Sequence, residues 1–400
     1  MLKDIEKLAV VAAKEERTII GLMSGTSLDG LDIALCKVSG SGRDTKVSLE
    51  AFATAPYHDD YRSNIGAVFS KRDVDLELVC LLNPYVARIQ ARLINQQLRA
   101  WDVQPQDIDL IASHGQTIYH APKSQHKRDV FSNATLQIGD GDHMALETGV
   151  ITISDFRQKH IAAGGEGAPL AAYGDYLIFS TPAENRILLN IGGIANITFL
   201  PKSLEAREVF STDIGPGNTI MDAYIREYFP GKLYDTDAEL AGAGAVHERL
   251  LRELMSSEFF AVGFPKTTGP ELFNLGYLKR AQQNTGTQAL SHTDIMATLN
   301  RFSAETIAEA IVACPAYPAS ATIFASGGGV HNPLLIATIQ NLLPQTDIKS
   351  TAELFVDPDA KEAVLFAILA NECVAGQGAG IGNPDAGIPS ISMGKISLCH

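Results

Sequence analysis

Short apolar runs separated by glycine-rich polar turns recur along this 400-residue chain. Apolar residues 18–20 lead into the stretch GLMSGTSLDG, and a second apolar run covers residues 31–38. Further runs at 110–112, 134–138 and 150–156 each end in a polar residue or a glycine. Short apolar runs bounded by turn residues indicate buried strands, so we predict strands at these positions with polar groups at their ends.

Helical segments alternate with these strands. Val86, Ile89, Leu93 and Leu98 recur at spacings of three to five residues, which predicts a helix with one buried face. A second, short helix is expected after the glycine-acid turn at residues 139–141. Strands alternating with helices predict an α/β fold, in which ligands bind near the carboxyl ends of the strands.

The second half of the chain repeats this layout. Residues 186–200 read as strand, glycine turn and strand, and the Gly-Pro-Gly-Asn loop at 215–218 leads into a helix. Residues 321–326 form a further apolar run that is followed by three glycines and another helical pattern. We therefore predict two related α/β domains, with a cleft between them that is lined by glycine turns.

The composition excludes several classes of protein. A formal net charge of −14 disfavours binding to nucleic acid or to an anionic membrane through the overall field. The five cysteines form no CxxC pair, which argues against a zinc site and a disulfide framework. The N-terminal residues predict an amphipathic helical extension, because their apolar core is too short and too charged for a signal peptide. No run is long enough to span a membrane, so we expect a cytoplasmic protein.

The turn at residues 24–30 carries more polar chemistry than a chain reversal requires. Backbone N–H groups in a glycine turn can bind phosphate oxygens, but Thr26 occupies the place where a P-loop has lysine. Asp29 would repel a phosphate unless a cation lay between them, and Mg²⁺ commonly binds carboxylates together with phosphate oxygens. The alternative is a simple hairpin turn capped by Asp-Gly.

Eight motifs occur in one order along the chain: GTSLDGLD, HGQT with a following His and Pro, DFR with AAGGEGAPL, NIGGIANIT, DIGPGN, PKTTGPELFN, SGGGVHN and KEAVLFAILA. Together they resemble the anhydro-N-acetylmuramic acid kinase family, which also includes the levoglucosan kinases, from Thr18 to about Ala375. The resemblance implies two ribonuclease-H-like domains of the actin, hexokinase and Hsp70 superfamily around an ATP cleft. We expect the first domain to comprise residues 1–155 and 360–400, and the second to comprise 156–359.

The resemblance also implies a reaction, a metal and an assembly. Water attacks the anomeric carbon of a 1,6-anhydro sugar, the bridge opens, and the freed O6 takes the γ-phosphate of ATP with Mg²⁺. Asp155 of the DFR motif is then the general base, and Arg157 orients that carboxylate or an anionic substrate group. Alternatively, both residues cap the following segment. A homodimer is expected as well.

The remaining roles are in binding. Residues expected to hold the nucleotide are Gly25, Thr26, Ser27, Leu28, Asp29, Gly30, Leu31, Asp32, Gly192, Gly193, Asn196, Gly215, Gly217, Asn218, Gly327, Gly328, Gly329 and Asn332. Asp29 and Glu362 are the metal candidates. The glycines can also be ordinary strand–helix turns. Glu362, early in a helix that Asp357 and Pro358 are expected to start, can simply complement the helix dipole.

The residues expected to face the sugar are His114, Gln116, Gly165, Glu166 and Glu271. A histidine at a strand end can instead be structural. Four departures from the family pattern leave the preferred anhydro sugar open: His160 for Asp, Glu166 for Gln, Ile214 for Thr and Pro270 for Arg.

Two other functions fit some of these residues. A glycoside hydrolase could use Asp155 and Glu166 as paired carboxylates, but it would not need several phosphate-type turns. A non-catalytic nucleotide or sugar switch would have no use for a water-activating base at Asp155. An anhydro-N-acetylmuramic acid kinase is therefore the main hypothesis, and a kinase for another anhydro sugar such as levoglucosan is the alternative.

Overall fold

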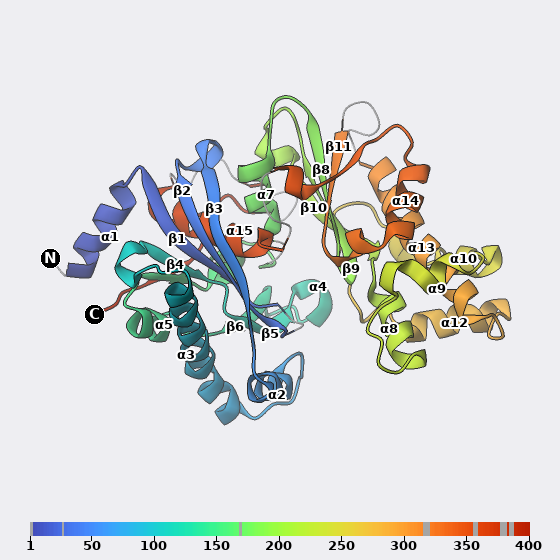
Figure 1. The fold of residues 1–400 in the computed structure, drawn as a ribbon, viewed down its shortest axis with the longest axis horizontal. Helices are drawn as coiled ribbons and strands as arrows, with labels where there is room; N and C mark the ends of the chain where they lie inside the picture. The colour runs from blue at the N-terminus through green and yellow to red at the C-terminus, as the bar shows by residue number, and fades with distance from the viewer. Residues whose placement is uncertain are drawn as a thin grey trace. The chain divides into compact units, whose positions relative to one another are not determined.

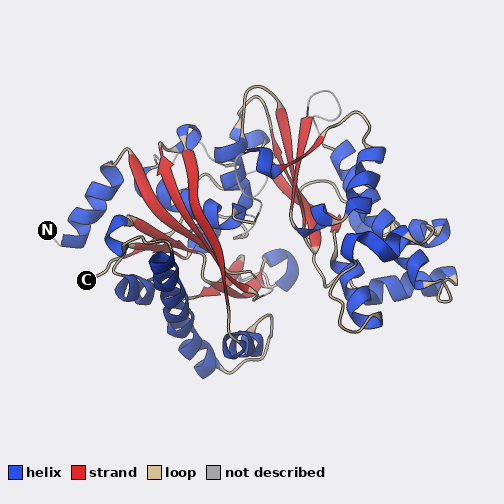
Figure 2. Cartoon of the chain, viewed as in Figure 1, coloured by secondary structure: helices blue, strands red, loops and turns tan. Residues whose placement is uncertain are grey.

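The chain folds into two compact units. The computed structural model describes residues 3–25, 28–167, 170–314, 321–354, 359–376, 382–383 and 388–400, with the side chain of Ser124 excepted. Unit 1 comprises residues 1–179 and 359–400, and unit 2 comprises residues 180–358. Each unit contains a sheet with helices packed against it (Figures 1 and 2).

Unit 1 is built mainly from the N-terminal part of the chain and closes with a returning C-terminal segment. Its helices and strands are α1 (Lys3–Ala13), β1 (Glu16–Met23), β2 (Gly30–Ser39), β3 (Lys46–Pro56), α2 (Asp59–Val68), α3 (Leu76–Ala100), β4 (Leu110–Ser113), β5 (Gln116–Ala121), α4 (Lys123–His126), β6 (Ala134–Ile138), α5 (Gly141–Thr148), β7 (Thr152–Ser154), α6 (Phe156–Ala162), α7 (Ala171–Phe179), α15 (Lys361–Ala375) and β13 (Lys395–Ser397).

The main sheet of unit 1 has the strand order β13-β7-β4-β1-β2-β3. Strands β1, β2 and β3 form an antiparallel meander, whereas β4 and β7 run parallel to β1. The carboxyl ends of β1, β4 and β7 therefore meet at one edge of the sheet. Strands β5 and β6 form a separate two-stranded ribbon.

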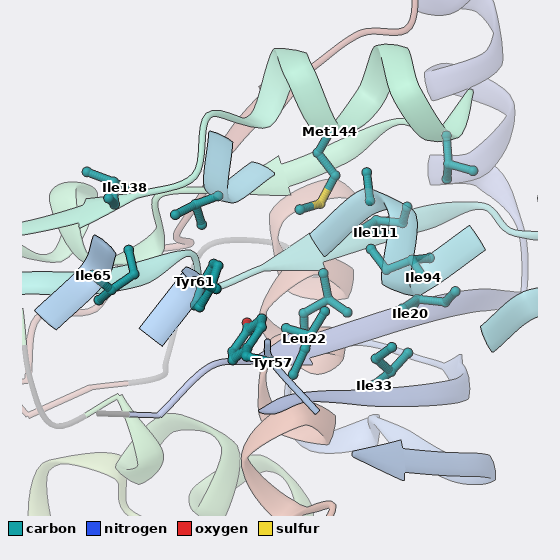
Figure 3. Packing of buried hydrophobic residues seen from close by; sticks show 14 of the residues in the cluster. Ile20, Leu22, Ile33, Tyr57, Tyr61, Ile65, Ile94, Ile111, Ile138 and Met144 are labelled. Carbon is teal, nitrogen blue, oxygen red and sulfur yellow. The ribbon is translucent and has the colours of Figure 1, made fainter. Parts of the chain in front are cut away.

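Alternate residues of β1 pack on opposite faces of this sheet, as the period of two in a strand requires. Ile20 and Leu22 belong to a core that also contains residues of α2, α3 and α5, such as Tyr61, Ile94 and Met144 (Figure 3). On the other face lies α15, and Gly21 of β1 faces its backbone. A Cβ atom at Gly21 would lie 1.9 Å from the Ala363 carbonyl oxygen, so only glycine permits this approach.

Unit 2 begins with three strands and continues into a helical region. Its elements are β8 (Asn185–Ile191), β9 (Ile194–Leu200), β10 (Phe210–Pro216), α8 (Thr219–Tyr228), α9 (Glu239–Gly242), α10 (Glu248–Leu254), α11 (Glu258–Ala261), α12 (Leu275–Thr285), α13 (His292–Val312), β11 (Ala321–Ser326), α14 (Pro333–Leu342) and β12 (Ile348–Ser350). One core lies between the sheet and helices α13 and α14, and a second joins α8, α10, α12 and the first half of α13.

The two sheets share one topology. The order β10-β9-β8-β11-β12 in unit 2 corresponds to β3-β2-β1-β4-β7 in unit 1. In both sheets three antiparallel strands are followed by two strands parallel to the first. The predicted α/β fold with two ribonuclease-H-like domains is therefore confirmed, and the two glycine turns that looked alike in sequence occupy equivalent positions.

The structure corrects the expected unit boundary. Residues 156–179, which were assigned to the second domain, lie in unit 1. The reason is packing: α7 lies against α15, and a Cβ atom at Gly174 would approach the Leu365 side chain to 2.4 Å. The strand expected at 150–156 is also shorter, because Phe156 already begins α6.

Other local predictions have clear outcomes. The N-terminal extension is helical, as expected, and Arg17 anchors the end of α1 by donating to the carbonyl oxygens of Val11, Ala12 and Lys14. Helix α15 begins at Lys361 with Ala360 at its N-cap, while Asp357 and Pro358 lie outside the described residues. Within the described residues no helix is long and apolar enough to cross a membrane.

Replacing Gly21 with alanine should destabilise unit 1. The added methyl group overlaps the α15 backbone, which has no side-chain rotamer to relax, so we expect a loss of about 3 kcal/mol or more. Thermal unfolding monitored by circular dichroism would show a midpoint lowered by several degrees. Gly66→Ala in α2 is the matched control, because its Cβ atom meets nothing within 4 Å and alanine favours a helix. Equal midpoints for the two variants would contradict this account of the β1–α15 contact.

Candidate functional site

The predicted polar groups of unit 1 lie at the carboxyl-end edge of its sheet. Leu22 pairs with Ser113, and Ser113 pairs with Ser154, so β1, β4 and β7 end at the same level. The β1–β2 turn, His114 and Asp155 directly follow these strand ends. The structure therefore brings together three of the motifs that the sequence singled out. Thr26 and Ser27 lie outside the described residues.

A buried polar network supports the β1–β2 turn. Ser24 Oγ donates to Gln116 Oε1 at 2.6 Å and lies 2.9 Å from the Tyr57 hydroxyl. Gln116 Nε2 in turn donates to the Gly25 carbonyl oxygen at 3.4 Å, and Gln90 Nε2 donates to the Tyr57 hydroxyl. Burial raises the pKa of Tyr57, so the hydroxyl stays protonated. Gln116, expected to face a sugar, is 0% exposed, and its side chain bonds Ser24 and Gly25 at the start of the turn.

The second half of the turn presents carboxylates. Leu28 has a positive φ of 59°, and the exposed Asp29 accepts a backbone hydrogen bond from Tyr57 N–H at its carbonyl oxygen. Asp32, two residues beyond Gly30, accepts a hydrogen bond of 2.6 Å from Thr54 Oγ1. Burial raises the pKa of Asp32, and the neighbouring Asp359 and Asp29 act in the same direction. Negative charge is therefore concentrated beside the turn.

Asp155 occupies the first position after β7 with an unusual backbone. Its φ of 54° and ψ of 45° lie in the left-handed region, which non-glycine residues adopt rarely and often at functional sites. It stands at the N-cap of α6, yet its side chain makes no capping hydrogen bond. The carboxylate forms an ion pair with Lys395 of β13. The capping alternative therefore does not describe this side chain.

Arg157 turns inward and contacts His114 and not Asp155. Its Nε donates to His114 Nε2 at 3.0 Å, and its Nη1 donates to the Gly167 carbonyl oxygen at 2.6 Å. Since arginine only donates, His114 Nε2 carries no proton, and Nδ1 donates to the Gly115 carbonyl oxygen at 3.0 Å. Burial, and then the charge of Arg157, lower the pKa of His114 well below its usual value. His114 is thus a buried neutral imidazole.

His160 organises the glycine loop that carries Gly165 and Glu166. Its Nδ1 accepts a hydrogen bond of 3.0 Å from the Gly167 amide, and a Cβ atom at Gly165 would lie 2.1 Å from its ring. Burial lowers the pKa of His160 to about 4, with a further contribution from Arg157. The proton therefore resides on Nε2, which has no hydrogen-bond partner among the described residues. Arg157 and His160 hold the carbonyl and amide groups of Gly167 from two sides.

Helix α15 brings Glu362 to the same part of unit 1. Desolvation raises the pKa of this carboxyl group; Lys361 and Arg157 oppose the shift, while Asp32 and Asp175 increase it. Four residues further along, Phe366 packs against His114 with ring centroids 4.9 Å apart. The described residues contain no group of three or more His, Cys, Asp or Glu side chains that could hold a metal ion.

The glycine turns of unit 2 meet at the equivalent edge of its sheet. Gly217 N–H and Thr219 N–H donate to the Gly193 carbonyl oxygen, and Asn218 N–H donates to that of Gly192. Gly327 has a φ of 84°, and a Cβ atom there would lie 2.4 Å from Asn190 Oδ1. Among the nucleotide candidates at this edge, Gly215 and Asn196 lie on neighbouring strands where β10 is bulged.

A cavity of about 400 Å³ opens beside these turns, a volume typical of small-molecule sites. Three predicted nucleotide residues, Asn218, Gly328 and Asn332, line it. Asn332 also caps α14 by accepting from Leu335 N–H at 2.9 Å, as the sequence suggested. Sequence reasoning missed the other lining residues, which are Met221, Asp222, Tyr234, Asp235, Thr236, Asp237 and His331. Burial raises the pKa of Asp222 to about 6.

Glu271 belongs to unit 2, whereas the other sugar candidates belong to unit 1. It approaches Asp213 of β10, whose pKa burial raises to about 6, with a further contribution from Glu271. The preceding loop is tied to the strand, because Thr268 N–H donates to Asp213 Oδ2 at 2.9 Å. The structure thus places His114, Gly165 and Glu166 together and Glu271 in the other unit.

The repeated strand order, with glycine turns at the ends of the strands, defines the two-domain, ribonuclease-H-like fold. The chain belongs to the anhydro-N-acetylmuramic acid kinase family, whose family model matches residues 17–394. This range includes the glycine turn at residues 24–30, the DFR motif at residues 155–157 and the glycine turns of unit 2.

Relatives support this assignment over nearly the whole chain. The protein is 58% identical to the anhydro-N-acetylmuramic acid kinase of Pseudoalteromonas atlantica over 399 residues, which cover 100% of both chains. It is 38% identical to that of Caldanaerobacter subterraneus, covering 98% of this chain and 100% of the other. Among solved structures, component A of (R)-2-hydroxyglutaryl-CoA dehydratase from Acidaminococcus fermentans aligns with a TM-score of 0.42 at 12% identity, covering 90% and 100%.

The buried His160 should make the protein lose stability in acid. Its folded pKa of about 4 lies below the unfolded value of about 6.5, so the unfolded state binds more protons between these limits. Its contribution is complete above pH 6.5 and falls away as the pH approaches 4, by up to about 3 kcal/mol. Urea unfolding of wild type and His160→Gln at several pH values measures this contribution to the free energy of unfolding. The difference between the two proteins should change across this interval, and a constant difference would contradict the buried neutral imidazole.

Proposed function

We propose that the protein is an ATP-dependent kinase that hydrolytically opens the bridge of 1,6-anhydro-N-acetylmuramic acid and phosphorylates O6. Two relatives that are 58% and 56% identical are named anhydro-N-acetylmuramic acid kinase, which supports this choice of substrate. The single observation that carries the chemistry is Asp155, whose carboxylate follows β7 at the edge shared with the β1–β2 turn. We also infer a cytoplasmic homodimer from the family resemblance, and light scattering after gel filtration tests the dimer.

In the proposed reaction, Asp155 removes a proton from a water molecule as the water oxygen bonds to C1. The C1–O6 bond breaks, and O6 takes the γ-phosphoryl group while ADP leaves. The products are N-acetylmuramic acid 6-phosphate, ADP and one proton. His114 and Arg157 do not exchange protons in this scheme. The pKa of Arg157 is lowered to about 10 by burial, so it stays charged at neutral pH and fixes the neighbouring loop.

The nucleotide is assigned to two sets of turns. The cavity next to Asn218, Gly328 and Asn332 suits a nucleoside by its volume and its polar lining. The residues from Gly25 to Asp32 are assigned to the phosphates, because Ser24 and Gln116 hold the start of this segment at the end of β1. Glycine turns suit phosphate because backbone N–H groups can approach the oxygens closely.

Asp29 and Glu362 would hold Mg²⁺. Burial is the main cause of the raised pKa values of Asp32 and Glu362, and neighbouring carboxylates raise both further. Several carboxylates therefore lie near one another in this part of unit 1, which suits a cation. Mg²⁺ typically takes one or two carboxylates and completes its shell with phosphate oxygens and water, so a larger set of protein ligands is not required. When bound, the ion neutralises charge on the transferring phosphoryl group.

Asp155→Asn should lower kcat by about 10²–10⁴-fold, because it removes the proton acceptor and preserves the side-chain shape. ADP release is measured with 1,6-anhydro-N-acetylmuramic acid and levoglucosan in parallel. Asp142→Asn, an exposed carboxylate of α5, is the matched control and should behave as wild type. Activity of Asp155→Asn equal to wild type would refute the base assignment. Faster turnover of levoglucosan by the wild type would show that levoglucosan, and not 1,6-anhydro-N-acetylmuramic acid, is the preferred substrate.

Gly328→Leu should fill the nucleoside cavity and spare the fold. The nearest atom to a Cβ there is Asn218 Nδ2 at 3.9 Å, so the side chain extends into open space. We expect the KM for ATP to rise about tenfold or more, while the KM for the sugar and the thermal midpoint stay near wild type. An unchanged KM for ATP would place the nucleoside elsewhere.

A further inference from the structure

Lys395 is a cation beside the proposed base that sequence reasoning did not identify. Strand β13 runs antiparallel to β7, and Lys395 pairs in register with Ser154, the residue before Asp155. The preceding Gly394 permits this close approach, because its φ is 110° and a Cβ atom would lie 2.4 Å from Ile153 Cγ2. The backbone therefore fixes where the lysine stem begins.

The ammonium group pairs with Asp155 and still faces solvent. Lys395 Nζ donates to Asp155 Oδ2, and the lysine side chain is 65% exposed, against 26% for that of Asp155. An ammonium group has three N–H donors, and this contact uses one of them. The other donors are available to a second acceptor on the solvent side.

Among the described residues, no basic side chain other than that of Lys395 pairs with Asp155. Arg157 donates to His114 and to Gly167, and it is directed into the packed interior. His114 and His160 carry no charge at neutral pH, because burial lowers the pKa of both. Lys159 of α6 is exposed and lies near Cys373 of α15. Lys395 is therefore the cation best placed to meet an anion that approaches the Asp155 carboxylate.

An acidic sugar needs such a cation. The chain has a formal net charge of −14, and Asp155 adds a negative charge at the point where the anomeric carbon must approach. The proposed substrate carries a lactyl carboxylate on O3, in the same ring as C1. A neutral anhydro sugar has no such group and would not need to overcome this repulsion.

We propose that the Lys395 ammonium group binds the carboxylate of the sugar substrate while it remains bonded to Asp155, and thereby selects acidic anhydro sugars. This inference rests on the proposed function and assigns a specificity residue within it. The bridging contact gives one charge-assisted hydrogen bond to an acidic substrate and none to a neutral one. It also holds the Asp155 carboxylate, which lacks any capping contact of its own, in one orientation.

The test compares two sugars that differ only in the lactyl group, 1,6-anhydro-N-acetylmuramic acid and 1,6-anhydro-N-acetylglucosamine. Lys395→Met should raise the KM for the acidic sugar about tenfold to a hundredfold, the range for losing one hydrogen bond to a charged group. The KM for the neutral sugar should change less than about threefold. Lys395→Arg should restore most of the preference. Lys37→Met is the control, because it removes another exposed ion pair of unit 1.

Calorimetric titration of each sugar without ATP separates this inference from the proposed reaction. If wild type releases no ADP but binds the acidic sugar more tightly, and Lys395→Met abolishes that preference, the specificity role holds and the proposed reaction fails. An equal loss with both sugars would overturn the inference and leave Lys395 as a residue that only positions Asp155. Unchanged binding and turnover in Lys395→Met would overturn it as well.

Discussion

The arrangement of unit 1 depends on the direct contact between β1 and α15 at Gly21. Because no side chain separates the strand from the helix, the helix axis lies close to the sheet, and α15 reaches the edge where β1, β4 and β7 end. The contact thereby sets the position of Glu362 at the start of the helix and of Phe366 one turn later. Phe366 packs on both His114 and Phe156, so the residues that flank the proposed base share one support.

Desolvation then determines the protonation states at this edge. Arg157 remains a cation although burial lowers its pKa, whereas burial keeps His114 and His160 neutral. Two neutral imidazoles beside a buried guanidinium can accept hydrogen bonds without adding repulsion. Gly167 in the glycine loop is consequently held by one neutral acceptor, His160, and one donor, Arg157, while Asp155 and Lys395 keep their charges accessible to solvent. Charge available for ligands is thus separated from charge used for structure.

Local signals in the sequence predicted the features that depend on neighbouring residues. The strand ends at His114 and Asp155, the cap at Asn332 and the equivalence of the glycine turns at residues 24–30 and 192–193 all follow from short apolar runs and turn residues. The contacts of Gln116 were not predictable, because its partners Ser24 and Tyr61 come from distant segments. Lys395 lies 240 residues from Asp155, and no periodicity connects them. The boundary of unit 1 at residue 179 was not predictable for the same reason, because α7 belongs to unit 1 through its packing on α15.

The two units carry the same strand order but distribute their chemistry differently. At the edge of unit 2 the turns are mostly glycine, with backbone atoms packed against one another, and the cavity alongside is lined by side chains that include Asp222 and His331. At the equivalent edge of unit 1 the strand ends carry His114 and Asp155, supported by Arg157. A duplicated fold needs to keep only the packing that sets the strand ends, because this packing determines where the edge lies and not which residues occupy it. One unit can therefore carry glycine turns beside a cavity at this edge, while the other carries the Asp155 carboxylate that the proposed hydrolytic step requires.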